Sequence, residues 1–577
     1  MFDLVIRNGL VVDGTGSVPF HADVAIEGDR IAAIGPDLAE GAREIDATGR
    51  IVTPGFVDVH THYDGQATWD DELAPSTPHG VTTIVMGNCG VGFAPVKPDR
   101  HQFLIELMEG VEDIPGTALS EGMSWDWESF EEYLDVLDRG RYTADIAAMI
   151  AHGPVRAYVM GERGAKNEPA GEDDLAAMAD IVTRAIEAGA KGFSTSRTIA
   201  HRALDGEPVP GTYAPEDELF ALGRAVKAAG KGIFEVAPAG VAGPDHVAPD
   251  TEVEWMCRLA SETGVPITFL MLQTDDAPDD WRKHLELISR ARAEGHDITA
   301  QVAGRPFGLL SGLTARHRFG DMPSFAPLVG LPVSEQVERM RDPELRAALV
   351  AESRAQIESL RAEMPEIAKA MDTWDRSFPL GDPVDYEPGY EDSIAGIAEA
   401  KGLDPLEVYY DCLLERDGQA IVMMMLLNYS YGNGDALYEM LNNDSAILGL
   451  ADGGAHCNMI CDASTPTWML THWARDRTQG PQIPLETVVK KLTSDTAALF
   501  DFDDRGRLEV GLRADVNVID HGRLTLREPH MVADLPAGGT RFLQGAEGYD
   551  YTIVAGQITR DHDTFTDARP GRLVRSE

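Results

Sequence analysis

Residues 55 to about 500 alternate short apolar runs with longer helix-like stretches, and this rhythm limits the fold more than any other feature. Such alternation is typical of a parallel sheet built from βα units. Helices are predicted at Asp173–Ala188 and Glu216–Ala229. Nine runs are strand candidates, one more than a (β/α)8 barrel needs, and Ala420–Leu427 is the one expected to be extra. The other candidates are Phe56–His60, Thr82–Met86, Asp145–Ile150, Gly192–Thr195, Gly232–Val236, Pro266–Leu270, Asp297–Val302 and Ala446–Leu450.

The two ends of the chain read differently from its middle. Residues 1–54 and 505–577 contain short apolar runs punctuated by turn residues, the spacing of a β-sandwich or meander. We expect the two ends to pair into one composite β-sandwich domain beside an α/β barrel of residues 55–504. A stretch at about 305–405 interrupts the barrel rhythm. It is predicted to be an insertion over one face of the barrel, either a lid or an inert helical elaboration.

Charge and composition exclude some classes of partner. The 577 residues include 96 acidic and 49 basic side chains, a formal net charge of −47, which repels nucleic acids and anionic membranes. No secretory signal is visible at the start, and no apolar run reaches the roughly 20 residues of a membrane span. Five cysteines without framework spacing fit a reducing compartment. We therefore expect a cytoplasmic protein that acts on a small molecule, and the sequence leaves the oligomeric state open, a homo-oligomer included.

A histidine pair, His60 and His62, closes the first strand of the barrel pattern. Residues i and i+2 of a strand project to the same face, so both imidazoles reach one point in space. Imidazole is a common ligand for zinc, iron and copper. The alternative is two surface histidines on an edge strand, but the apolar neighbours Phe56, Val57 and Val59 indicate a buried strand. We predict a metal site where this strand ends.

Polar side chains also follow three other strand candidates. Cys89 follows the second, His152 the third and Asp452 the last. Barrel enzymes build their active sites at these carboxyl ends of the strands. A thiolate and a carboxylate added to two imidazoles would complete a zinc ligand set. Zinc lowers the pKa of water from about 15.7 towards about 7, and a neighbouring carboxylate can take up its proton and pass it to a leaving amine.

With these motifs the chain resembles the amidohydrolase superfamily and, within it, the N-acyl-D-amino-acid deacylase (D-aminoacylase) group. The resemblance implies a (β/α)8 barrel with a composite β-sandwich, zinc in the barrel mouth, and hydrolysis of an amide on a D-configured amino acid. It makes His60, His62, Cys89 and Asp452 the metal ligands, with Asp452 also the general base and acid. The matching segments are Asp3–Gly16, Pro54–Asp64, Gly87–Pro95, Gly192–Ser196, Asp452–Gly454, and Leu492–Ala497 through Ala514–Asp520.

The chain departs from the family at two ligand positions. The family has two further histidines, at the ends of the fifth and sixth strands, where this chain has Ala237 and Met271. A thioether is a poor zinc ligand and a methyl group is none. We therefore expect one zinc ion per chain, with the second subsite of the family absent or rebuilt. Glu235 is a conceivable replacement ligand, although a structural role is the stronger expectation.

Three residues are candidates for contact with substrate. Arg197, after the fourth strand, could meet a substrate carboxylate or could pair with one of the abundant acidic residues. His152 is a second candidate. Tyr213 resembles a family tyrosine near the substrate and could donate to a developing oxyanion.

The expected function is a zinc-dependent hydrolase that cleaves the amide bond of an N-acyl amino acid, D-configured by the resemblance, or a similar small amide. The same site could instead hydrolyse a cyclic amide, a lactone or an ester. A third hypothesis, suggested by the two missing histidines, is a barrel that binds metabolites without turnover.

Overall fold

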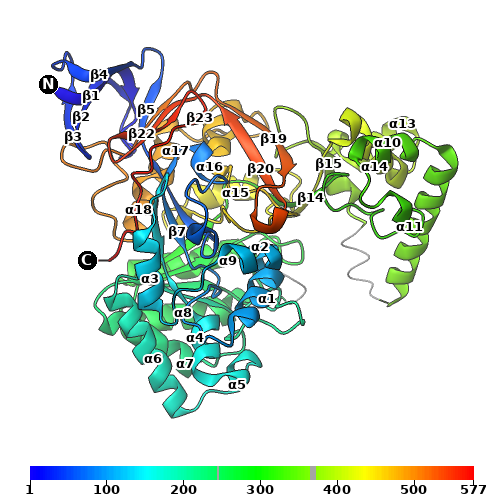
Figure 1. The fold of residues 1–577 in the computed structure, drawn as a ribbon, viewed down its shortest axis with the longest axis horizontal. Coiled ribbons are helices and arrows are strands. Elements are labelled where there is room, and N and C mark those ends of the chain that lie inside the picture. The colour runs from blue at the N-terminus through cyan, green and yellow to red at the C-terminus, as the bar shows by residue number, and fades with distance from the viewer. Residues whose placement is uncertain (243–245, 364–371, 577) are drawn as a thin grey trace.

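The computed structural model describes residues 1–242, 246–363 and 372–576. Part of the predicted insertion, residues 364–371, lies outside the described residues. Figure 1 shows a β domain, a barrel surrounded by helices, and a helical lobe on the far side of the barrel from the β domain.

The two ends of the chain share one sheet, as predicted. Its central pairing is antiparallel, between β5 (Ile51–Pro54) and β18 (Val516–Ile519), with Val52 opposite Val518. The strand order is β23-β22-β21-β18-β5-β1-β2-β3, and β4 pairs with β1. Because half of the sheet comes from each end, neither end can complete it alone. The remaining strands are β1 (Phe2–Val11), β2 (Phe20–Glu27), β3 (Arg30–Gly35), β4 (Gly41–Asp46), β21 (Tyr549–Val554), β22 (Gln557–Asp561) and β23 (Thr564–Phe565).

The barrel consists of two parallel sheets, β6-β7-β8 and β9-β10-β11-β12-β13-β17. Strands β8 and β9 are two parts of one strand, interrupted at Met149. The two sheets have three and six strands, and counting β8 and β9 as one leaves the eight strands of a (β/α)8 barrel. The predicted fold is confirmed. The bounds are β6 (Phe56–Thr61), β7 (Val81–Met86), β8 (Asp145–Ala148), β9 (Ile150–Ala151), β10 (Gly192–Ser196), β11 (Ile233–Ala237), β12 (Ile267–Leu270), β13 (Ile298–Val302) and β17 (Ala446–Leu448).

The barrel closes between its first and last strands. The Asp452 N–H donates to the carbonyl of His60 (3.0 Å), and the His62 N–H donates to the carbonyl of Gly453 (2.8 Å). This closure brings the segment after β17 against the histidine pair, although almost 400 residues separate them in the chain.

The barrel helices begin where local sequence favours a helix start. Helix α6 (Glu172–Glu187) has three acidic residues in its first turn, and so does α7 (Glu216–Ala228). Negative charge there is favourable because the backbone N–H groups of the first turn point outward without partners. Both helices agree with the predicted ranges to within one residue. Further helices on the barrel are α8 (Pro249–Thr263), α9 (Asp280–Ala293), α15 (Asp435–Leu441), α17 (Leu485–Leu492) and α18 (Ser494–Leu499).

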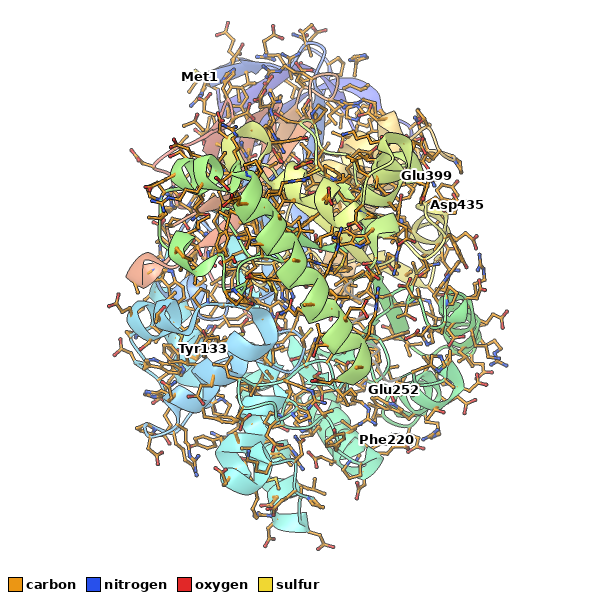
Figure 2. All side chains as sticks on the ribbon, turned by 90° about the vertical axis from the view of Figure 1, so that its right-hand side faces the viewer. Met1, Tyr133, Phe220, Glu252, Glu399 and Asp435 are labelled. Atoms are coloured by element: carbon orange, nitrogen blue, oxygen red, sulfur yellow. The ribbon has the colours of Figure 1, made fainter. Side chains whose placement is uncertain are left out.

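The helical lobe, residues 307–427, interrupts the barrel between β13 and β17. The extra strand candidate belongs to it, as β16 (Val422–Leu427), which pairs antiparallel with β14 (Phe307–Ser311) and β15 (Ser377–Pro379). Viewed from the lobe side, its long helix α11 (Pro343–Glu363) crosses in front of the barrel (Figure 2). Since α14 (Pro405–Leu413) packs into the lobe's own core, the lobe continues beyond residue 405. Its other helices are α10 (Val333–Met340) and α13 (Ile394–Lys401).

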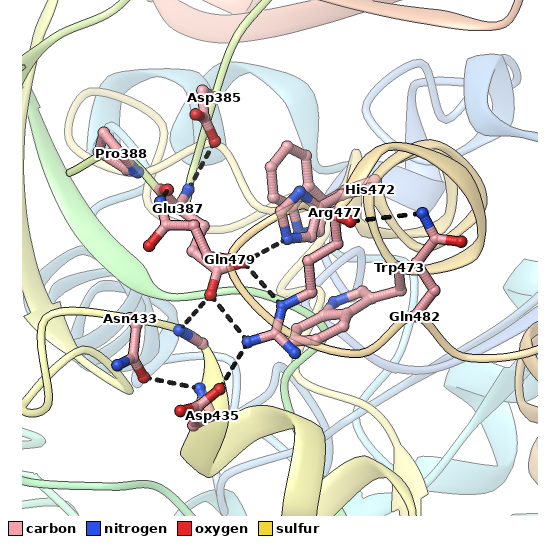
Figure 3. A network of polar contacts seen from close by, with 12 residues as sticks. Asp385, Glu387, Pro388, Asn433, Asp435, His472, Trp473, Arg477, Gln479 and Gln482 are labelled. Atoms are coloured by element: carbon pink, nitrogen blue, oxygen red, sulfur yellow. Dashed lines mark hydrogen bonds and ion pairs between the residues drawn. The ribbon is translucent and has the colours of Figure 1, made fainter.

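A buried polar network holds a segment of this insertion, residues 380–390, against the last part of the barrel (Figure 3). The Glu387 carboxylate accepts two hydrogen bonds from the Arg477 guanidinium, both 2.9 Å, and lies 2.7 Å from Nε2 of His472. Arg477 also donates to Asp435 (2.8 Å), and the Gly434 N–H donates to Glu387 (2.6 Å). The network therefore joins three stretches that are distant in sequence. Among the described residues, no helix has the length and apolarity needed to cross a membrane.

Candidate metal centre

Three of the predicted ligands converge at the carboxyl end of the barrel. One donor atom each of His60, His62 and Cys89 lies within 4.8 Å of the other two, and all three side chains are buried. The Cys89 sulfur is 3.4 Å from Nε2 of His60. The fourth predicted ligand is adjacent, since Oδ1 of Asp452 lies 3.5 Å from His60 Nε2 and 3.8 Å from His62 Nε2. Within the described ranges, this is the only group of three or more such donors.

The backbone holds Cys89 and Asp452 in an uncommon conformation. Both are in the left-handed region, with φ of 56° and 46°. Non-glycine residues adopt it at a cost of about 1–3 kcal/mol, and such strain clusters at functional sites. Next to Cys89, a Cβ on Gly90 would come within 2.7 Å of the Ser196 nitrogen, so only glycine fits there. The turn that presents the thiol is therefore fixed by packing against β10.

Each histidine has a polar partner at its other ring nitrogen. Nδ1 of His60 is 2.9 Å from Oε1 of Gln301, which lies on β13 and is fully buried. Nδ1 of His62 is 3.4 Å from Oε1 of Glu112, at the end of helix α1 (His101–Glu112), but makes no hydrogen bond among the described residues. An acceptor at Nδ1 fixes a histidine with its proton there, leaving Nε2 free to bind a cation. Sequence reasoning missed both partners. Gln301 left a faint signal as a polar residue inside an apolar strand, and Glu112 left none.

Burial dominates the electrostatics of the centre. It lowers the pKa of His60 to about 3 and of His62 well below the ordinary value, so both imidazoles are neutral. It also raises the pKa values of Cys89, Glu112 and Asp452 well above their ordinary ranges. A desolvated cluster of neutral imidazoles, a thiol and carboxylic acids is one that a divalent cation stabilises, by binding the deprotonated ligands. Two imidazoles, a thiolate and a carboxylate are also a donor set that zinc prefers, so these residues fit that ion.

Glu235 lies on β11 beside the thiol. Its Oε2 accepts a hydrogen bond from the Cys89 N–H (3.1 Å), while Oε1 is enclosed without a hydrogen-bond partner. Burial raises its pKa to about 8. Holding the Cys89 backbone is the structural role expected for this residue. Ala237 and Met271, where the family has histidines, are buried at the ends of β11 and β12.

The three predicted substrate contacts lie in different surroundings. His152 is fully buried, with Nδ1 2.8 Å from Thr195 Oγ1 and Nε2 3.0 Å from Glu218, so both ring nitrogens are occupied. Arg197 donates to Glu252 (2.8 Å) and to the carbonyl of Ala214 (2.9 Å).

Tyr213 is 60% exposed and makes no hydrogen bond among the described residues. Contact of these three residues with substrate stays a prediction.

Two further histidines lie at the same end of the barrel. His456, four residues after Asp452, has Nε2 3.7 Å from Glu112, so Glu112 lies between His62 and His456. His201 accepts or donates at Nδ1 with Ser196 Oγ (3.0 Å) at the end of β10. Burial lowers the pKa of each to about 4. With His60, His62 and His152, this end of the barrel thus carries five imidazoles whose pKa values are lowered by burial.

The fold and this centre together define a metal-binding (β/α)8 barrel of the hydrolase type. Over residues 43–560 the sequence matches the amidohydrolase family, and the chain belongs to that family. The family predicted from the sequence is confirmed.

The chain is similar to known deacylases in sequence and fold. D-aminoacylase of Alcaligenes xylosoxydans xylosoxydans is 28% identical over 577 residues, which cover 99% of this chain and 97% of that one. N-acyl-D-glutamate deacylase of the same organism is 33% identical over 312 residues, 53% of this chain and 57% of that one. The structure of N-acyl-D-glutamate deacylase from Bordetella bronchiseptica, complexed with zinc and a phosphonate mimic of the tetrahedral intermediate, has a TM-score of 0.64 at 22% identity over the whole of both chains. At that identity the structural likeness establishes the fold alone.

Proposed function

We propose that this protein is a metal-dependent hydrolase of small amides, acting on the amide bond of N-acyl amino acids. The observation that carries the proposal is the convergence of His60, His62 and Cys89 within 4.8 Å, with the Asp452 carboxylate beside both imidazoles. The relatives named D-aminoacylase and N-acyl-D-glutamate deacylase support a D-configured substrate. We further propose zinc as the ion, one per chain, and the cytoplasm as the location.

The ligands would hold the ion between the imidazoles, the thiol and the carboxylate. When bound, zinc would supply Lewis acidity and lower the pKa of water in the site. Gln301 would keep Nε2 of His60 unprotonated and aimed at the ion, and Glu112 would lie beside Nδ1 of His62.

Asp452 is the proposed general base and acid. Burial raises the pKa of its carboxyl group above the ordinary value. A carboxylate beside the attacking water can accept a proton and later return it. The carboxylate would accept the proton of the attacking water and then deliver it to the nitrogen of the leaving amine. The hydrogen bond from the Asp452 N–H to the His60 carbonyl, which closes the barrel, holds the Asp452 backbone beside the histidine pair.

Three residues are the proposed substrate contacts. The Arg197 side chain is 19% exposed. It could therefore bind a substrate carboxylate while it stays paired with Glu252. Tyr213 would donate from its exposed position to the developing oxyanion. His152 is buried and would contribute to substrate binding through its hydrogen bond to Thr195.

The metal content of purified protein tests the centre directly. We expect about one zinc per chain by plasma mass spectrometry, and loss of that zinc in His60→Ala, because one of four ligands is removed. His530→Ala is the matched control, since His530 is exposed on β19 (Thr525–Val532) and far from the cluster in sequence. Protein that retains no metal and binds none on titration would favour a barrel that binds metabolites without turnover.

The hydrogen bond between Gln301 and His60 gives a second test. Gln301→Met keeps the size of the side chain and removes the acceptor, and we expect a loss of about 10- to 100-fold in zinc affinity. Gln301→Glu restores an acceptor and should recover most of that loss. Competition with a chelating dye measures both. Equal affinities in all three proteins would show that Gln301 does not orient His60.

A further inference from the structure

Buried cations elsewhere in this chain are paired with carboxylates. Each of the seven buried arginines among the described residues lies within 4.0 Å of at least one carboxylate oxygen. This is expected, because an ammonium or guanidinium group removed from water is costly unless it is paired. The seven are Arg156, Arg305, Arg477, Arg505, Arg513, Arg541 and Arg560.

Two buried lysines differ from this pattern. Lys191 is 5% exposed and Lys491 is 7% exposed, and no carboxylate lies within 4.0 Å of either one in the described part of the chain. Nζ of Lys191 donates only to the carbonyl of Phe500 (3.3 Å) and lies 4.3 Å from the centroid of the Phe502 ring. The side chain of Lys491, on α17, makes no hydrogen bond among the described residues. Burial lowers the pKa of both, that of Lys191 to about 8.

Both lysines line the same cavity. Its volume is about 380 Å³, and it lies at the amino ends of β11, β13 and β17, on the face of the barrel opposite the metal centre. Helices α17 and α18 form another wall. The cavity is therefore separate from the proposed active site.

Carboxylates also border the cavity, but at its solvent side. Two of them are compensated, since Lys490 binds Asp495 (2.7 Å) and Arg292 lies 4.0 Å from Asp297. The other two, Asp444 and Asp501, are exposed to water. Asp444 and Asp495 raise the pKa of Lys491, and Asp501 and Asp504 raise that of Lys191, but burial outweighs them. None of these carboxylates lies within 4.0 Å of either ammonium group, so the buried lysines lack a direct partner among the described residues.

We propose that this cavity, which Lys191 and Lys491 both line, binds the anionic group of a small molecule, a carboxylate or a phosphate. An anion there would supply the partner that both ammonium groups lack, through charge-assisted hydrogen bonds. The volume admits a small metabolite and excludes a macromolecule. The proposal does not depend on the reaction at the metal centre.

Thermal unfolding and isothermal titration of the full chain test it, with inorganic phosphate and acetate as separate probes and sodium chloride keeping ionic strength constant. We expect at least one probe to bind at the cavity, at about one per chain, and to raise the Tm saturably. Lys491→Met should weaken that binding about tenfold or more, because the methionine keeps the apolar stem and removes the charge. Lys490→Met is the matched control and should change it by less than about threefold, since Lys490 is half-exposed and already paired.

The same variant has a second signature. Without phosphate or acetate, Lys491→Met should unfold at a higher temperature than the wild type, because an unpaired buried charge has been removed, and the difference should close as the binding probe is added. If phosphate binds more tightly than acetate, the preferred anionic group is a phosphate. If acetate binds more tightly, it is a carboxylate. An anion that binds in the barrel mouth would still bind to Lys491→Met. Only the binding that this variant loses is therefore assigned to the cavity. No effect beyond that of chloride, undiminished binding in Lys491→Met, or equal losses in Lys491→Met and Lys490→Met would overturn the proposal.

Discussion

Asp452→Asn is expected to reduce kcat/KM for N-acyl amino acids by about 10³-fold or more while the protein stays folded. An amide of the same shape cannot accept the proton of the attacking water, so the proton transfer to the leaving amine is lost. The fold should tolerate the change for two reasons. Asparagine adopts the left-handed backbone of this position, where φ is 46°, with little strain. A neutral side chain also avoids the desolvation that raises the pKa of the Asp452 carboxyl.

Hydrolysis would be followed on a panel of N-acyl-D- and N-acyl-L-amino acids, with circular dichroism and Tm as measures of folding. Asp37→Asn is the matched control, because Asp37 also has a left-handed backbone, with φ of 52°, but is exposed in the β domain. The control should keep wild-type activity. Ordinary activity in Asp452→Asn would exclude the proposed mechanism, whatever the substrate.

Glu387→Gln is expected to destabilise the protein by about 3–5 kcal/mol, the usual effect of breaking a buried ion pair by removing one partner. The substitution keeps the shape and leaves the Arg477 guanidinium, which is 0% exposed, with Asp435 as its remaining carboxylate (Figure 3). Scanning calorimetry should show a Tm several degrees lower. Asp385→Asn, an exposed carboxylate in the same segment, should change stability by less than about 0.5 kcal/mol. Equal Tm values for wild type and Glu387→Gln would show that the network does not stabilise the fold.

The stability difference between wild type and Glu387→Gln should depend on pH. Burial by itself raises the pKa of Glu387, but hydrogen bonds from His472 and Arg477 outweigh it and lower the pKa from 4.5 to about 2. Since the folded pKa is the lower one, the stability gained from the ionised carboxylate is complete above about pH 4.5 and is lost as the pH falls towards 2. The Tm difference between wild type and Glu387→Gln should therefore be constant near neutrality and shrink below about pH 4.5. A difference that grows on acidification would contradict this assignment.

Much of the fold could be predicted from local sequence periodicity. Helices α6 and α7 were predicted to within a residue because apolar spacing and acidic first turns act within one segment. The histidine pair was found in the same way, since the i, i+2 geometry of a strand is independent of the rest of the molecule. The extra strand, Ala420–Leu427, could be suspected from the count of candidates, but its antiparallel partners β14 and β15 could not.

Parts of the site depended on family resemblance or were not found. The positions of Cys89 and Asp452 among the ligands came from the resemblance, because neither residue is distinctive alone. Glu112 was missed because its contact with His62 joins the end of a helix to a strand about 50 residues earlier. No local sequence pattern around Glu112 or His62 indicates that the two side chains meet.

By itself the sequence determined the class of fold, the β-rich character of its two ends and the strand end that presents two imidazoles, because these follow from short-range periodicity and motif. Only the tertiary structure decided which distant groups meet there. The hydrogen bonds that close the barrel bring Asp452 to His60, and the packing of β13 brings Gln301 behind the same ring. It also placed Lys191 and Lys491 at the opposite face, where no carboxylate of the described residues lies within 4.0 Å of either ammonium group. Burial and pairing are properties of the assembled barrel, and no local stretch of sequence encodes them.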